Sequence, residues 1–338
     1  MRTPDRSAIN LSATAVEFER VTKIFVQRQH TGATRGVWHN LLHREKKRVR
    51  ALSDMSVKIT TGEFVAYAGP NGAGKSTTIK TIAGMLVPES GAVRVMGVEP
   101  SRHRVEIMRH MGVLFGNRTE LWWDHPVSAS FIWKRVVWDV PKDEYGRMLK
   151  QVTELLDIGP LMNTYARELS LGQRMRCDLA MALVAGPSLI LLDEPTLGLD
   201  VLAKRQMIGF LKTLNRERGA TIVVTSHDMD DLEEMAQRMV LIAKGEIAFD
   251  GDFTGLRQFM GARREIRLIT DSALAPEIPG ATWLESEGLS HLYAYSGGDM
   301  RELLSGLSKV EGVRDVAFQS APLEKTVAQL YAKWSGTG

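Results

Sequence analysis

The sequence predicts an α/β protein with a largely parallel sheet, followed by a small α+β domain. Over about the first 255 residues, short apolar strand candidates alternate with amphipathic helical patterns. After residue 255 the pattern changes to short strand candidates separated by proline and glycine. The 338 residues suffice for two such units at roughly 150 residues per domain. We therefore expect a first domain at 1–255 and a second at 256–338.

Composition and charge exclude several classes of protein. Hydrophobic residues make up 44% and charged residues 25%, as in an ordinary globular chain. The 43 basic and 40 acidic residues leave a net charge of +3, which is too near neutral to favour nucleic-acid binding on charge alone. The single cysteine, Cys177, rules out a disulfide framework and a cysteine-built zinc site. We expect it to be a small core residue.

We expect a soluble, cytoplasmic chain that does not cross a membrane. The N-terminal sequence contains no apolar run long enough for a signal peptide. The most apolar stretch, 179–192, has 14 residues and is interrupted by Gly186, Pro187 and Ser188. A helix needs about 20 apolar residues to span a bilayer.

Strands and helices alternate in the first domain. Apolar runs predict strands at 63–69, 111–116, 189–194 and 221–227. A helix is predicted over 203–214, whose broad apolar face consists of Met207, Ile208, Phe210, Leu211 and Leu214. The stretch 118–165 has no convincing strand and carries four tryptophans, so we expect a mostly helical insert.

The second domain is predicted to be a small α+β unit of about 80 residues, large enough for its own core. Its strand candidates are EIRLIT, ATWLES, LSHLYAYS and GVRDVAF. A first helix carries Met300, Leu303, Leu304 and Leu307 at helical spacing. A last helix carries on one face Leu323, Thr326, Val327, Leu330, Tyr331 and Trp334.

One segment, HREKKRVR at 43–50, is strongly basic, with five Lys or Arg residues against one Glu. Its simplest interpretation is a solvated loop. A second interpretation is a loop near anionic headgroups or an acidic partner, because each clustered basic residue gains about 1 kcal/mol near an anionic membrane. Nucleic acid is the weakest alternative, since no aromatic residue is interleaved.

A phosphate-binding loop is predicted at 69–77, where GPNGAGKST fits G-x-x-x-x-G-K-[ST] between a strand and a helix. Its glycines let backbone N–H groups wrap a phosphate chain, and the following helix presents its positive end. The lysine reaches the β and γ phosphates, and the serine hydroxyl can ligate Mg²⁺. The predicted binding residues are Gly69, Pro70, Asn71, Gly72, Ala73, Gly74, Lys75, Ser76 and Thr77.

Two carboxylates follow a buried strand in LILLDE. Asp193 suits a contact with Mg²⁺, and Glu194 can polarise the water that attacks the γ phosphate. A merely solvated pair at the end of a strand is the alternative. The phosphate-binding loop upstream favours the catalytic interpretation.

The order GPNGAGKST, LSLGQ, LILLDEPTLGLD, VVTSHD resembles the nucleotide-binding subunit of ATP-binding cassette (ABC) transporters over about residues 15–250. The resemblance implies an α/β P-loop NTPase with a parallel-sheet core, an antiparallel β subdomain and a helical subdomain. It also implies ATP and Mg²⁺ as cofactors. Two subunits would sandwich two ATP molecules head to tail, with the LSLGQ signature of one facing the phosphate loop of the other.

The same resemblance implies further nucleotide contacts. Ser170, Gly172 and Gln173 of the signature would face the γ phosphate of the partner's ATP. Phe25 would stack on adenine, with an ordinary core role as its alternative. His227 would contact the γ phosphate, although a lone histidine is more often structural. The resemblance also implies that Asp200 lies at the dimer interface.

Two positions depart from the family pattern. Leu171 stands in the signature where glycine is commonest, and we do not interpret it as loss of function. Asn117 stands where the family usually has a glutamine that touches Mg²⁺ and the attacking water. Asparagine is one methylene shorter, so it is in question whether its amide reaches Mg²⁺ and the water. ATP turnover, or its coupling to the membrane partner, is in question for the same reason.

The branch that serves drug, antibiotic and polymer exporters is the best match, from FGNRTELWWDHP, LSLGQRMRCDLA and the C-terminal domain. An exporter ATPase would work at the cytoplasmic face of the cell membrane with a separate integral membrane permease, and with a second copy of itself or a paralogous ATPase. An import ATPase and a soluble, non-transport ABC ATPase are the alternatives. Trp122 and Trp123 are expected in the helical-subdomain core or, alternatively, at the permease contact.

Overall fold

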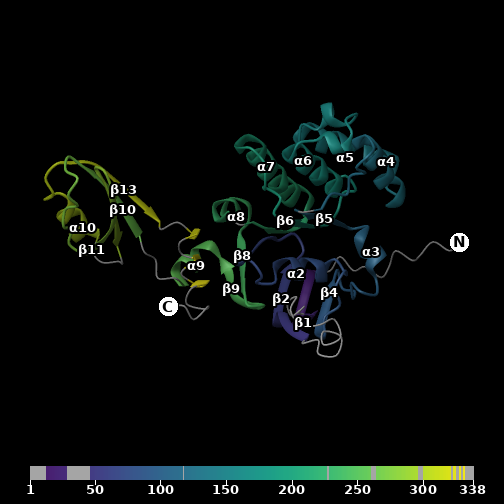
Figure 1. Cartoon of the computed structure of the whole chain (residues 1–338), viewed down its shortest axis with the longest axis horizontal. Helices are drawn as coiled ribbons and strands as arrows, with labels where there is room; N and C mark the ends of the chain where they lie inside the picture. The colour runs from purple at the N-terminus through teal and green to yellow at the C-terminus, as the bar shows by residue number, and fades with distance from the viewer. Residues whose placement is uncertain are drawn as a thin grey trace, which may run out of the picture. The chain divides into compact units, whose positions relative to one another are not determined.

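The computed structural model describes the chain at 13–28, 46–116, 118–226, 228–259, 264–295 and 300–320, and at six positions between 323 and 331. The chain divides into two compact units, Met1–Asp250 and Gly251–Gly338. Figure 1 labels the helices and strands of both units. Within the described residues, no helix has the length and apolarity to span a bilayer.

A six-stranded sheet forms the centre of the first unit. Its order is β5 (Met111–Phe115), β6 (Leu189–Asp193), β7 (Thr221–Thr225), β3 (Phe64–Ala68), β8 (Arg238–Ala243) and β9 (Glu246–Asp252). The strands from β5 to β8 pair in parallel. Parallel strands are covered on both faces, which explains their continuous apolar sequences. The four predicted strands and the α/β fold are confirmed.

Helices cover the central sheet (Figure 1). They include α2 (Lys75–Ile82), α3 (Arg104–Met108), α6 (Leu171–Leu183), α7 (Val201–Arg218) and α8 (Met229–Met235). The buried side of α7 consists of the five apolar residues predicted from its sequence. Asp200 starts α7 by accepting a hydrogen bond from the Ala203 N–H, and Gly219, with φ of 64°, ends it.

A second sheet is antiparallel, with the order β2-β1-β4. Its strands are β1 (Thr14–Arg28), β2 (Lys46–Thr60) and β4 (Ser90–Val95). The expected loop at 43–50 is wrong for 46–50, because these residues begin β2 and pair with the end of β1. Alternation explains the difference, since half-buried Val49 lies opposite Phe25 while Arg48 and Arg50 are exposed. Residues 43–45 lie outside the described residues.

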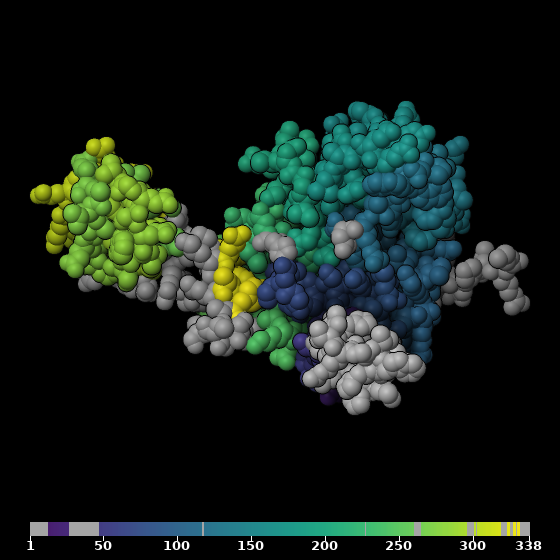
Figure 2. Space-filling model, in the orientation of Figure 1, coloured from purple at the N-terminus to yellow at the C-terminus, as the bar shows by residue number. Residues whose placement is uncertain are grey.

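The helical subdomain is confirmed and forms a separate teal lobe of the first unit (Figure 2). It contains α4 (Val127–Val137), α5 (Lys142–Leu155) and the 3-10 turns Gly159–Leu161 and Ala166–Glu168. Its core includes Phe131, Met148 and Val152. The expectation of Trp122 and Trp123 in this core is wrong, because they are 39% and 51% exposed.

Trp122 and Trp123 make their contacts at the surface instead of in the core. The Trp122 ring packs on the rings of His125 and Trp133, with centroids 5.3 and 5.7 Å away. The Arg174 guanidinium lies 5.9 Å from the Trp123 ring centroid. Both indoles therefore lie on the surface of the lobe.

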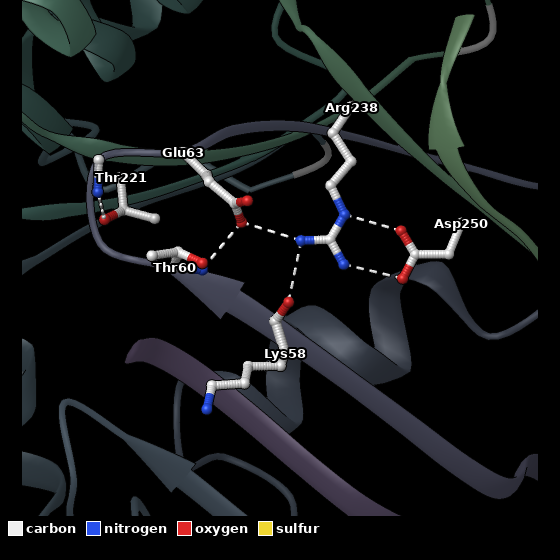
Figure 3. Close-up of polar contacts among 7 residues, drawn as sticks. Lys58, Thr60, Glu63, Thr221, Arg238 and Asp250 are labelled. Atoms are coloured by element: carbon white, nitrogen blue, oxygen red, sulfur yellow. Dashed lines mark hydrogen bonds and ion pairs between the residues drawn. The ribbon is translucent and has the colours of Figure 1, made fainter. Parts of the chain in front are cut away.

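Arg238, at the start of β8, ties the two sheets of the first unit together (Figure 3). Its guanidinium donates to both carboxylate oxygens of Asp250, at 2.7 and 2.8 Å. It also donates to the Lys58 carbonyl and to Glu63, each at 2.9 Å. Glu63 in turn accepts from the Thr60 N–H at 2.8 Å. This bidentate, charge-assisted network fixes β2 beside β3 and β8.

The second unit begins with α9 (Phe253–Phe259) and contains an antiparallel sheet of order β11-β12-β10-β13. The strands are β10 (Arg264–Thr270), β11 (Ala281–Glu287), β12 (Ser290–Tyr295) and β13 (Val313–Ser320), and α10 spans Met300–Leu307. Its core includes Ile266, Leu268, Tyr293, Leu303 and Leu307.

The predicted helical faces of the second unit are confirmed in part. Leu304 is 51% exposed, although its spacing predicted burial. In the last helical stretch Leu323, Val327 and Leu330 are buried. Thr326 and Trp334 lie outside the described residues.

Candidate nucleotide site

The phosphate-binding loop opens onto a cavity of about 420 Å³ in the first unit. Seven of the nine predicted loop residues line it, together with both carboxylates that follow β6. Gly69 and Ala73 do not line the cavity, and Ala73 is part of the core. The lining residues of the loop are Pro70, Asn71, Gly72, Gly74, Lys75, Ser76 and Thr77.

Glycine is required in this loop by backbone shape and by space. Gly74 has φ of 117°, and a Cβ there would lie 2.5 Å from the Ala51 carbonyl oxygen. Gly72 has φ of 82°. Gly74 caps α2 without a side chain. The first N–H groups of that helix are therefore left for an anion in the cavity.

Lys75 lies almost fully buried beside the cavity, with 8% of its surface exposed. Its Nζ donates to the Gly69 carbonyl at 2.5 Å and to the Pro70 carbonyl at 3.4 Å. Burial lowers the pKa of this ammonium, and the negative charges of Glu194 and Asp193 oppose that change. The two carbonyl oxygens hold the Lys75 ammonium beside the cavity. Phosphate oxygens of a bound nucleotide would replace these carbonyls as its hydrogen-bond partners.

Ser76 and Asp193 meet at one edge of the cavity. The Ser76 hydroxyl donates to Asp193 Oδ2 at 2.9 Å. Thr225, at the end of β7, donates from its hydroxyl to Asp193 Oδ1 at 2.7 Å. A hydroxyl and a carboxylate are hard oxygen donors, and Mg²⁺ takes few such protein ligands because it keeps waters and substrate phosphates. The donor set therefore fits Mg²⁺.

Glu194 directly follows β6 and has φ of 58°, in the left-handed region that residues with side chains seldom adopt. Its N–H donates to both oxygens of Thr225, the carbonyl at 3.2 Å and the hydroxyl at 3.1 Å. Such backbone strain persists where surrounding contacts hold it and is frequent at active sites. Thr225 was missed by the sequence reasoning. The strand-end threonine in TIVVTSH was the available signal.

The signature loop does not line the same chain's cavity. Ser170 starts α6 with a capping box, in which its hydroxyl accepts from the Gln173 N–H and the Gln173 side chain accepts from the Ser170 N–H. A Cβ at Gly172 would lie 2.9 Å from the Gly198 carbonyl oxygen. Glycine at this position therefore permits close packing against the LGLD loop.

Four other predicted residues lie elsewhere or outside the described residues. Phe25 is half-buried on β1, 5.6 Å from Lys23 Nζ, and does not line the cavity. Asp200 caps α7. Asn117 and His227 lie outside the described residues. The adenine, interface, metal and γ-phosphate roles expected of these four residues remain predictions.

Comparison with known proteins shows the family of this chain. The family model described as ABC transporter matches residues 52–197. The ATP-binding protein NatA of Bacillus subtilis is 31% identical over 212 residues, which cover 63% of this chain and 86% of NatA. This chain belongs to the ATP-binding proteins of ABC transporters. It is therefore an ABC-type ATPase.

Other relatives of this ABC ATPase differ in the transport named for them. The methionine import ATP-binding protein MetN of Carboxydothermus hydrogenoformans is 30% identical over 213 residues, covering 62% of this chain and 63% of MetN. The ABC ATPase spans only 36% of a putative ABC transporter ATP-binding protein of Streptomyces avermitilis, at 37% identity. These relatives do not set a transport direction for the chain.

Solved structures support the fold of the ABC ATPase. A structure of the ATP-binding subunit of an ABC transporter has a TM-score of 0.62 at 23% identity, covering 73% of this chain and 94% of that one. The ATP-binding cassette MJ0796, dimeric and bound to ADP and Pi, has a TM-score of 0.58 at 24% identity, with coverage of 70% and 98%. At these identities the likeness shows the cassette fold alone.

Proposed function

We propose that this ABC ATPase powers an exporter by hydrolysing ATP in a head-to-tail pair with a second copy or a paralogous subunit. The observation that carries the ATPase part is the convergence of Lys75, Ser76, Asp193 and Glu194 on one cavity. The exporter part rests on the resemblance of residues 115–126, residues 169–180 and the C-terminal domain to exporter subunits. Import is the second candidate, because a relative of similar identity is named as an import protein.

The proposed roles follow from charge and geometry. Lys75 and the α2 N-terminus bind the β and γ phosphates. Ser76 and Asp193 would hold Mg²⁺, which neutralises charge on the phosphate oxygens when it is bound. Glu194, fixed through its backbone to Thr225, accepts a proton from the attacking water.

An exposed apolar surface around the signature supports the paired assembly. Leu171, Leu197, Val201 and Leu202 are 49%, 56%, 69% and 66% exposed. They lie at the signature and at the loop that leads into α7, two segments that pack together through Gly172 and Gly198. Clustered exposed apolar side chains are typical of a protein interface. In the proposed head-to-tail pair, this surface contacts the phosphate-loop side of the second ATPase subunit.

A second exposed surface supports the membrane partner. Trp122, Trp123, Ile132 and Val136 are all 39% or more exposed on the helical subdomain. Large exposed aromatics anchor protein interfaces. We infer that this lobe contacts the permease, which places the ATPase peripherally at the cytoplasmic face of the membrane. Nothing in the near-neutral charge of the chain favours a nucleic-acid partner.

A Glu194→Gln variant tests the ATPase and the pairing together. It should bind Mg-ATP, lose almost all hydrolysis and dimerise in light scattering. Adding Leu202→Asp should abolish the dimer, because Leu202 lies in the apolar surface around the signature. The matched control adds Val105→Asp, which changes an equally exposed valine on α3 and should leave the dimer intact. Near-parental hydrolysis by the Glu194→Gln variant would refute the role of Glu194.

Copurification tests the membrane partner. Affinity purification from detergent-solubilised membranes, followed by mass spectrometry, should yield one or two integral membrane proteins. The same yield from a Trp122→Ser/Trp123→Ser variant would contradict the proposed contact. Direction is then measured in proteoliposomes with ATP outside and labelled cell extract on both sides. ATP-dependent accumulation of label in the lumen supports export, and ATP-dependent loss supports import.

A further inference from the structure

A buried carboxylate lies on the signature helix outside all of the ATPase motifs. Asp178 is about two turns after the Ser170 cap of α6, and only 7% of its surface is exposed. Its Oδ1 accepts hydrogen bonds from the Thr119 hydroxyl at 2.7 Å and from the Glu120 N–H at 3.1 Å. A buried carboxylate is costly unless it is hydrogen-bonded, so these two donors account for its place in the fold.

The segment that Asp178 holds begins at the wall of the nucleotide cavity. Gly116 and Arg118 line that cavity, and Thr119 and Glu120 follow directly. A Cβ at Gly116 would lie 3.3 Å from the Glu194 Cβ, so this wall is next to the proposed general base. The segment that follows the cavity wall is therefore joined to α6 through the Thr119 hydroxyl and the Glu120 N–H.

The same segment is fixed on its other side. The Leu121 N–H donates to the Thr119 hydroxyl at 3.1 Å, so this hydroxyl is both donor and acceptor. Lys134 of α4, which is 3% exposed, donates to Glu120 at 2.6 Å. The Trp122 N–H donates to the buried Ser130 hydroxyl at 2.9 Å. Residues 119–122 are thus tied to α4 and α6 by directional polar contacts.

We propose that Asp178 is a positioning residue for ATP hydrolysis, which fastens the cavity wall at Arg118 to the signature helix. Nucleotide bound in the cavity would then move α6 as one body with this wall. The proposal rests on the proposed function, in which the α6 N-terminus faces ATP held by the partner subunit. Asp178 would link the two nucleotide sites of the pair within one chain. It would act through Thr119 and Glu120 and would not touch the nucleotide.

Two single variants and a double variant test the tether. Thr119→Val keeps the side-chain shape and removes the hydroxyl that donates to Asp178. Asp178→Ala removes the acceptor. The matched control is Arg176→Gln on the same helix, because Arg176 donates to the Leu156 and Asp157 carbonyls, away from the cavity. Turnover, the Kd for ATP and hydrogen exchange of residues 118–125 are measured for each protein.

Each single change should lower kcat about ten-fold, because the cavity wall beside Glu194 is then less well positioned. The Kd for ATP should stay within about two-fold of the parent, since the ligands of the nucleotide are intact. The losses in the double variant should be clearly less than additive, because both single variants remove the bond between Thr119 and Asp178. With no nucleotide present, the Glu120 and Leu121 amides should exchange faster in the variants than in the parent. Arg176→Gln should match the parent in all three measurements.

Parental turnover of a folded Thr119→Val protein would overturn the proposal, as would additive losses in the double variant. An equal loss of turnover in Arg176→Gln would show a general requirement of α6 and also overturn it. If Asp178→Ala does not fold, the near-isosteric Thr119→Val protein still decides the question. If the Glu194→Gln protein fails to pair on ATP, the proposed assembly fails, whereas the exchange measurement, which needs no nucleotide, still tests the tether.

Discussion

The hydroxyl of Thr225 is a single group on which the geometry of both site carboxylates depends. Its side chain is fully buried. It donates to Asp193 Oδ1 at 2.7 Å and accepts from the Glu194 N–H at 3.1 Å. Thr225→Val replaces this hydroxyl with a methyl group of similar volume. It therefore tests hydrogen bonding with little change in packing.

The size of the expected loss in Thr225→Val follows from these two hydrogen bonds. Losing a donor to a charged acceptor costs about 1.5–3 kcal/mol of stability. The Glu194 N–H keeps its 3.2 Å bond to the Thr225 carbonyl, so the second loss adds little. We expect the free energy of unfolding to fall by about 2–3 kcal/mol. Turnover should fall about ten-fold or more, because Asp193 and Glu194 are both less well oriented.

Thr225→Ser is the control, since it keeps the hydroxyl and loses only a methyl group, worth about 1 kcal/mol. Chemical unfolding and steady-state ATPase rates are measured on the parent and both variants. The serine protein should lose stability but keep most of its turnover. A valine protein with parental turnover, or a serine protein as slow as the valine protein, would refute the role assigned to the hydroxyl.

Two further predictions concern the nucleotide ligands. Lys75→Ala should weaken ATP binding itself, because it removes the buried ammonium at the phosphate loop, and calorimetry showing unchanged affinity would contradict this role. Asn117→Gln should raise basal hydrolysis if the shorter amide has lost its reach to metal and water, since one methylene is about 1.5 Å and a hydrogen bond tolerates only tenths of that. Asn117→Ala serves as the comparison, and slower hydrolysis by Asn117→Gln would show that asparagine is suited to its own loop.

Local patterns were enough to predict the core of the first unit. The phosphate loop, the strands and the buried face of α7 each depend on residues close together in sequence, so periodicity and turn chemistry determine them. Thr225 and Asp178 were not predicted, because their roles arise from partners that are 31 to 59 positions away. Only the fold brings β7 beside β6, and the 119–120 segment beside α6.

The errors also have physical causes. Val49 and Arg48 were grouped with a solvated basic loop, yet alternation along β2 lets Val49 face Phe25 while Arg48 faces solvent. Trp122 and Trp123 were expected in a core because of their size, yet aromatics are also the residues that interfaces expose. Composition alone does not separate a core from a docking surface.

The carboxyl of Asp178 gives the stability of the ABC ATPase an unusual pH dependence. Burial raises its pKa to about 6, with a smaller rise from Glu120, while the bonds from Thr119 and Glu120 N–H and the charge of Arg174 oppose the rise. Between the ordinary value of 3.8 and about 6, the native protein therefore binds a proton that the unfolded chain does not. The contribution of this group to stability must then increase as the pH falls through that window. This is opposite in sign to an ion-paired aspartate, whose stabilisation is lost on acidification.

The size of this effect can be measured by difference. Two-state linkage with pKa values of about 6 and 3.8 gives a gain on the order of 1 kcal/mol from this group between pH 7.5 and pH 5. Asp178→Asn keeps a carbonyl that accepts from Thr119 and has no such titration, so the parent should gain that amount relative to the variant over this range. Other groups titrate alike in both proteins and cancel. Unfolding free energies that stay parallel in the two proteins from pH 7.5 to 5 would show that Asp178 is solvated enough to titrate as an ordinary carboxylate, and would refute this pH dependence.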